Sequence, residues 1–227
     1  MSRLELWIPG PTEVAPEVLE LMARPPIGHR GPAIQELVGA IEPGLRALFG
    51  TREVFAATCS GTTVMEMGLR NLVGKRALVL ACGAFGKRWH AIAQANGIDS
   101  ELVLLDPGEG LTPELARKKL SGLGYDAVCL TQNETSTGVF NPIPDIVKTI
   151  REVEPEACVL VDAVSSLSAV ELDFDAVGAD LWLAGVQKAI ALPPGLAVYA
   201  LSERAIARAE TVENRGWATD FLKARDQ

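Results

Sequence analysis

Short apolar runs recur along this chain and alternate with segments in which apolar residues return at helical spacing. The runs are rich in Val, Leu and Ala and have the length of buried β-strands, and several helical segments open with Pro or Thr, which suit a helix start. The expected strands are Val54–Thr58, Ala77–Ala81, Leu102–Leu105, Ala127–Thr131, Val159–Asp162, Leu181–Ala184 and Leu196–Ala200, and the expected helices are Thr62–Leu72, Lys87–Asn96, Pro113–Leu120 and Pro144–Val153.

This alternation predicts an α/β fold in which a mostly parallel seven-stranded sheet is sandwiched by helices. In such a sheet, ligands bind beyond the carboxyl ends of the strands. The candidate chemistry should therefore lie in the loops that follow the strands, at residues 59–63, 82–86, 132–138, 162–166 and 185–188.

The length of 227 residues, with 48% hydrophobic residues, allows one sizeable core. We expect an N-terminal arm at residues 1–14 and one large ligand-binding domain at 15–210. The stretch 211–227 is more polar and shows no further apolar run, so we expect it to be a truncated linker toward a C-terminal domain.

Charge and composition exclude several classes of partner. The formal net charge of −8 disfavours nucleic acids and anionic membranes, because both require clustered Lys and Arg. The apolar stretch 181–201 has the length of a membrane span, but Lys188 and the Pro193-Pro194 pair interrupt it. The N-terminus lacks the features of a signal peptide, so we expect a cytoplasmic protein with a small-molecule partner. The four cysteines and two histidines have no ligand spacing, which predicts reduced thiols and no metal site.

Lys188 is the first candidate for chemistry, because it lies within the largely apolar run Leu183–Leu192, where burial would remove much of its hydration. Burial lowers the pKa of a lysine amine, and the neutral amine is the nucleophile that forms Schiff bases with carbonyl cofactors. A surface lysine whose stem lies along a strand end is the alternative.

Asp162 ends the apolar run 157–161, so its carboxylate should emerge at the same edge of the sheet. A carboxylate there can pair with the protonated ring nitrogen of pyridoxal 5′-phosphate (PLP) and so improve the ring as an electron sink. A helix cap or a turn is the alternative role.

Ser60-Gly61-Thr62 follows a strand and opens a helix, which gathers backbone N–H groups and hydroxyls at one anion-binding point. A helix cap without a ligand is the alternative. The Gly-rich motifs of dinucleotide and nucleoside triphosphate sites are absent from the sequence.

Phe85 lies in a Gly-bracketed loop, where its ring can stack on a flat cofactor or plug the core. Thr135, Ser136 and Thr137 precede Gly138 in a loop rich in hydrogen-bond donors. They can bind the polar groups of a cofactor or close a turn.

Taken in order, these motifs resemble the class V aminotransferases of the alanine–glyoxylate and serine–pyruvate type, which are fold-type-I PLP enzymes. The resemblance spans nearly the whole chain. It is carried by Ile8-Pro9-Gly10-Pro11-Thr12, Ile27-Gly28-His29-Arg30-Gly31-Pro32, Ser60-Gly61-Thr62, Gly83-Ala84-Phe85-Gly86, Asn133-Glu134-Thr135-Ser136-Thr137-Gly138-Val139, Val161-Asp162-Ala163-Val164-Ser165-Ser166-Leu167, Gly185-Val186-Gln187-Lys188-Ala189 and Pro193-Pro194-Gly195.

The resemblance implies PLP as the cofactor and a role for each matching residue. Lys188 would hold the cofactor as a Schiff base and move a proton, while Asp162 would pair with the ring nitrogen. Phe85 would stack on the ring. The other cofactor contacts would come from Ser60, Gly61, Thr62, Thr135, Val164 and Gln187.

The chain departs from the family's pattern in two places. Val186 stands where a serine often precedes the glutamine, which removes one polar phosphate contact. The sequence also stops before the C-terminal domain that supplies the arginine for the substrate carboxylate in this family. We therefore expect weak transamination by the polypeptide as given.

These observations predict a homodimeric aminotransferase that moves an amino group from a small amino acid, such as alanine or serine, to glyoxylate or pyruvate. Another PLP reaction on the same scaffold, by a lyase or a cysteine desulfurase, is the first alternative. Phe85 argues against the desulfurases, which resemble one another in placing a histidine there. A non-catalytic α/β domain derived from such an enzyme is the second alternative.

Overall fold

The computed structural model describes residues 5–120 and 123–226. All seven predicted strands form and join one sheet in the order β1-β9-β8-β7-β4-β2-β3, in which β9 runs antiparallel to both of its neighbours. The mostly parallel sheet is thereby confirmed. Its strands are β1 (Val54–Ala57), β2 (Arg76–Ala81), β3 (Asp99–Leu104), β4 (Ala127–Thr131), β7 (Cys158–Asp162), β8 (Leu181–Gly185) and β9 (Ala197–Leu201), and a separate hairpin pairs β5 (Asn133–Glu134) with β6 (Val139–Phe140).

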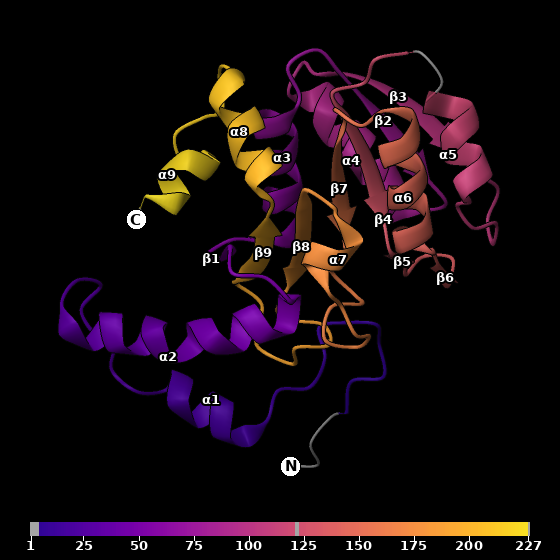
Figure 1. Ribbon diagram of the computed structural model, residues 1–227. Coiled ribbons are helices and arrows are strands. Elements are labelled where there is room, and N and C mark those ends of the chain that lie inside the picture. The colour runs from indigo at the N-terminus through magenta and orange to yellow at the C-terminus, as the bar shows by residue number, and fades with distance from the viewer. Residues whose placement is uncertain (1–4, 121–122, 227) are drawn as a thin grey trace.

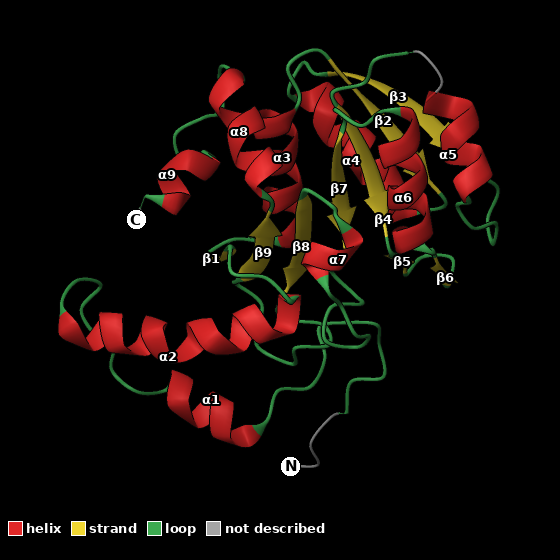
Figure 2. Ribbon diagram, viewed as in Figure 1, coloured by secondary structure: helices red, strands yellow, loops and turns green. Residues whose placement is uncertain are grey.

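Helices cover both faces of the sheet (Figure 2), because alternate residues of each strand point to opposite sides. In β4, Val128 and Leu130 belong to one core, and Ala127 and Cys129 belong to the other. The first core is covered by α5 (Pro113–Leu120), α6 (Ile143–Val153) and α7 (Phe174–Val177), and the second by α3 (Gly61–Leu72), α4 (Ala84–Ala95), α8 (Glu203–Thr211) and α9 (Phe221–Arg225).

Two further helices, α1 (Pro16–Met22) and α2 (Pro32–Phe49), lie apart from these layers, below the sheet in Figure 1. The sequence analysis did not predict them. Phe49 is their one buried residue among those described. Their apolar side chains stay exposed at Leu19, Leu21, Met22, Leu37, Val38 and Ile41.

The C-terminal segment differs from the expected polar linker. Phe221 is fully buried, and its ring centroid lies 5.6 Å from that of Tyr199 on β9. The Asn71 side chain on α3 accepts the Phe221 N–H at 3.0 Å and donates to the Thr219 carbonyl at 2.7 Å. One aromatic residue therefore fixes this polar segment to the main core. Gln227 and residues 1–4 of the expected arm lie outside the described residues.

The chain order creates a crevice at the carboxyl edge of the sheet. After β2 the chain adds β3 on one side, then crosses to place β4 on the other side of β2. The loops that follow β2 and β4 therefore leave the sheet in opposite directions, which is the usual ligand position in open α/β sheets. In the described part of the chain, no helix has the length and hydropathy to cross a membrane.

Candidate active site

A cavity of about 350 Å³ opens at this carboxyl edge, and a smaller hollow of about 20 Å³ adjoins it. The two share Phe85, Asp162, Val164 and Lys188 in their walls. Hollows of about 700 and 850 Å³ lie elsewhere on the chain, but neither Lys188 nor Asp162 lines them. The structure brings together all of the predicted site residues around these two spaces: Ser60, Gly61, Thr62, Phe85, Thr135, Asp162, Val164, Gln187 and Lys188.

Lys188 lies in the turn that follows β8, and the N-terminal arm holds it there. Its Nζ donates to the Pro9 carbonyl at 3.0 Å, and the Thr12 hydroxyl donates to the Lys188 carbonyl at 2.8 Å. A Cβ on Gly10 would lie 2.4 Å from the Lys188 side chain, and the φ of +145° at Gly10 disfavours other residues, so glycine suits this approach. The side chain is only half-buried, whereas the apolar run predicted deeper burial, because the chain turns at Val186 and Lys188 emerges from the core.

Asp162 ends β7 and is 3% exposed. Its Oδ1 accepts the Val164 N–H at 2.9 Å. Burial raises the pKa of this carboxyl to about 6, although the Val164 bond and the positive charges of Arg88 and Lys188 act in the opposite direction. The site therefore contains a buried acid that lacks a salt-bridge partner among the described residues.

The start of α3 forms the anion-binding end of the cavity. Ser60 caps the helix, and its Oγ accepts the Thr63 N–H at 3.3 Å. The first two helical amides, of Gly61 and Thr62, have no acceptor within the helix. A Cβ on Gly61 would lie 2.7 Å from Val164, so glycine lets this backbone approach the loop after β7.

Gln187 also lines the cavity, and its side chain packs against Gly185, where a Cβ would lie 2.5 Å from Gln187 Oε1. Val186 is 2% exposed and belongs to the core. Its side chain therefore adds no polar contact to the cavity, as the sequence predicted.

Phe85 lies in the first turn of α4, and a buried carboxylate fixes its backbone. Glu134 Oε2 accepts the N–H of Phe85 at 3.0 Å and that of Gly86 at 2.9 Å, while Oε1 accepts the Ser136 hydroxyl at 2.6 Å. Glu134 is fully buried at the amino end of α4, where the helix dipole favours negative charge. Glu134 was not among the residues expected in the site. The signal that could have identified it is a carboxylate three positions after the buried strand β4.

Thr135 directly follows β5 and lines the smaller hollow. Its hydroxyl donates to Ser165 Oγ at 2.8 Å, and Asn133 donates to the same oxygen at 3.0 Å. A cluster of hydroxyl and amide groups therefore borders the smaller hollow, between Phe85 and Asp162.

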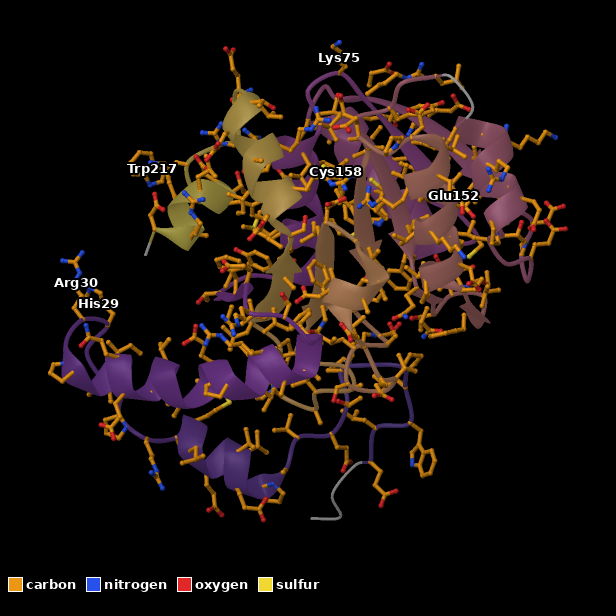
Figure 3. The ribbon with its side chains drawn as sticks, viewed as in Figure 1. His29, Arg30, Lys75, Glu152, Cys158 and Trp217 are labelled. Carbon is orange, nitrogen blue, oxygen red and sulfur yellow. The ribbon has the colours of Figure 1, made fainter. Side chains whose placement is uncertain are left out.

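One motif that carried the resemblance lies elsewhere. His29 and Arg30 project from the connection between α1 and α2, away from the sheet (Figure 3). They do not line the cavity of Lys188 within this chain. In the described part of the chain, His, Cys, Asp and Glu form no cluster suited to a metal ion.

Comparison with known proteins agrees with this geometry. The family model for aminotransferase class-V matches residues 29–226. A relative described as the soluble hydrogenase 42 kDa subunit of Anabaena cylindrica is 35% identical over 99% of this chain and 60% of its own length.

Two solved structures are also similar. The aspartate aminotransferase of subgroup IV from Thermus thermophilus is 36% identical with a TM-score of 0.86, and the match covers 96% of this chain and 62% of that one. The alanine–glyoxylate aminotransferase of Nostoc sp. is 29% identical with a TM-score of 0.90, covering 100% and 63%. The chain thus spans about 60% of the length of these proteins. From its family match and its fold, the chain belongs to the class V aminotransferases.

Proposed function

We propose that this chain forms the cofactor-binding part of a PLP-dependent aminotransferase. The observation that carries the proposal is the meeting of Lys188, Asp162, Phe85 and the start of α3 around one cavity. An amine, a buried acid, an aromatic ring and an anion-binding helix end match the carbonyl, ring nitrogen, ring face and phosphate of PLP.

The donor set fits this cofactor in detail. A buried carboxylate without a cationic partner is unfavourable, and the ring nitrogen of PLP would supply the missing positive charge. The close packing at Gly61 keeps the α3 amides at the cavity wall. Ser60, Gly61, Thr62 and Gln187 would hold the phosphate, Thr135 the ring hydroxyl and Val164 one face of the ring.

When bound, PLP supplies an electron sink for negative charge at the substrate α-carbon. Lys188 Nζ would hold the cofactor and then carry the proton taken from the α-carbon. Asp162 would keep the ring nitrogen protonated, because its carboxylate is stabilised by that charge. Phe85 would fix the plane of the ring and exclude water from one face.

The substrates that we propose are a small amino acid, such as alanine or serine, and a 2-oxo acid, glyoxylate or pyruvate. The name of the alanine–glyoxylate aminotransferase of Nostoc sp. supports alanine and glyoxylate, and that of the aspartate aminotransferase of Thermus thermophilus supports amino-group transfer more generally. We further propose a cytoplasmic homodimer, in which the exposed apolar residues of α1 and α2 are covered. A lyase or desulfurase remains the alternative reaction, and Phe85 disfavours the second of these. A non-catalytic domain derived from such an enzyme remains the other alternative.

The first test is covalent attachment of PLP to Lys188. The wild-type chain should acquire a visible absorbance band with PLP, and borohydride reduction should fix the label on the peptide that contains Lys188. Lys188→Ala should lose both signals, because it removes the amine. A label on Lys75 or Lys87 would contradict the assignment, and a wild-type chain that stays colourless would favour the non-catalytic domain.

A further inference from the structure

Arg88 is a residue of this cavity that the sequence analysis passed over. It lies on α4, three positions after Phe85, and lines the cavity together with Ser60 and Thr62. It is the one arginine among the described residues that line this space.

Two contacts hold the Arg88 side chain in place. Its Nη1 donates to the Thr62 hydroxyl at 3.2 Å, and its guanidinium carbon lies 4.8 Å from the centre of the Phe85 ring. Stacking on an aromatic face and a hydrogen bond restrict a flexible side chain before a ligand arrives. Since a guanidinium has five N–H donors, most of them remain available.

The position of this charge is unfavourable without an anion. Arg88 reaches the amino end of α3 at Thr62, where the helix carries partial positive charge, and it stands in the amino-terminal half of α4. In the part of the chain that the structure describes, no carboxylate lies within ion-pair distance of Arg88. Asp162 lines the same cavity and interacts electrostatically with Arg88, but it lies beyond ion-pair distance. The guanidinium and the amino end of α3 can therefore accept a further anion.

We propose that Arg88 binds the phosphate of the cofactor, together with the amides of Gly61 and Thr62. This inference rests on the proposed function, because PLP brings the anion. Arg88 would thereby neutralise part of the phosphate charge. The Arg88 side chain also stacks on Phe85, so one side chain would contact both the phosphate and the residue that stacks on the cofactor ring.

The test compares PLP with pyridoxal, which has the same ring and aldehyde but no phosphate. Arg88→Gln, Arg88→Lys and the control Lys87→Gln are each titrated with both compounds and followed by absorbance. Lys87 is exposed and is the neighbour of Arg88 on α4, but it does not line the cavity. Circular dichroism and the thermal midpoint show whether each variant is folded.

Arg88→Gln should weaken PLP binding about tenfold, since one charge-assisted contact is lost, and change pyridoxal binding less than twofold. Arg88→Lys should retain part of the PLP affinity, and Lys87→Gln should match the wild type. The difference between wild type and Arg88→Gln should shrink as salt is raised, because the site is open to solvent.

Equal losses for PLP and pyridoxal would overturn the proposal and leave Arg88 as a support for Phe85. An unchanged PLP affinity in Arg88→Gln would also overturn the proposal. If Arg88→Gln fails to fold, Arg88→Lys provides the test: a PLP affinity equal to that of the wild type and independent of salt would overturn the proposal. A wild-type chain that binds no PLP would instead overturn the proposed function, and this inference with it.

Discussion

At the scale of single residues, Asp162 is a buried carboxyl group. Its negative charge would help to bind the cofactor but lowers the stability of the folded chain when no cofactor is present. With the native pKa near 6 and an ordinary value of 3.8, the unfolded chain ionises first as pH rises. Unfolding then releases a proton, so this group lowers stability between pH 4 and 6, by about 3 kcal/mol once pH exceeds 6.

Asp162→Asn should therefore stabilise the cofactor-free chain at neutral pH and have little effect near pH 4. Asparagine keeps an oxygen that can accept the Val164 N–H, so the loop should be preserved. Urea unfolding at several pH values measures the difference, and PLP titration should show weaker binding by the variant. An identical pH dependence for both chains would show that Asp162 is not the buried acid responsible.

At the scale of elements, the β5–β6 hairpin positions the start of α4 through Glu134. In Glu134→Gln a single carbonyl oxygen must replace two carboxylate oxygens, and the new NH₂ group faces N–H donors. We expect a loss of about 1–3 kcal/mol in the free energy of unfolding and weaker binding of both PLP and pyridoxal, because the Phe85 ring loses its anchor.

Glu152→Gln on α6 is the matched control, since Glu152 is exposed, pairs with Arg117 at the surface and lines neither part of the cavity (Figure 3 labels it). Its free energy of unfolding should stay within about 0.5 kcal/mol of wild type. If Glu134→Gln behaved like this control in unfolding and in both titrations, the hairpin would have no role in placing Phe85.

The elements that could be predicted are those that a short stretch of sequence determines by itself. β4 and β7 are apolar runs that become buried strands, and Asp162 could be placed because it directly follows one of them. By contrast, α2 was not predicted from the sequence. Most of its apolar residues are exposed within this chain, so it is not one of the helices that pack on the sheet. The contact of Glu134 in β5 with Phe85 in α4 joins residues 49 positions apart, and only the sheet order reveals it.

At the scale of the whole molecule, the cavity has the groups that we propose for the cofactor, but among the described residues that line it Arg88 is the one arginine, which leaves no second arginine for a substrate carboxylate. The C-terminal arginines that could have served are engaged elsewhere: Arg204 and Arg208 contact Asp180 and Asp126, while Arg215 and Arg225 pair with Asp220 and Asp226. Arg88 is assigned above to the phosphate.

We therefore expect this polypeptide to bind PLP but to produce pyruvate from alanine and glyoxylate at least a hundredfold more slowly than a full-length class V enzyme. Misplacing a substrate by about 1 Å alone costs on the order of a hundredfold in rate. Coupled assay of pyruvate at saturating PLP provides the comparison. Similar turnover by the two would place a carboxylate site within these residues.

The contact between the arm and Lys188 has a consequence for the order of assembly during translation. Pro9 and Thr12 leave the ribosome long before Lys188, to which they bind, has been added to the chain. At common elongation rates that interval is roughly 10–40 s. Through that time Trp7 and Ile8, which stay largely exposed even after docking, must remain in solution without their eventual neighbours. The arm can therefore reach its place only after the segment around Lys188 has been synthesised.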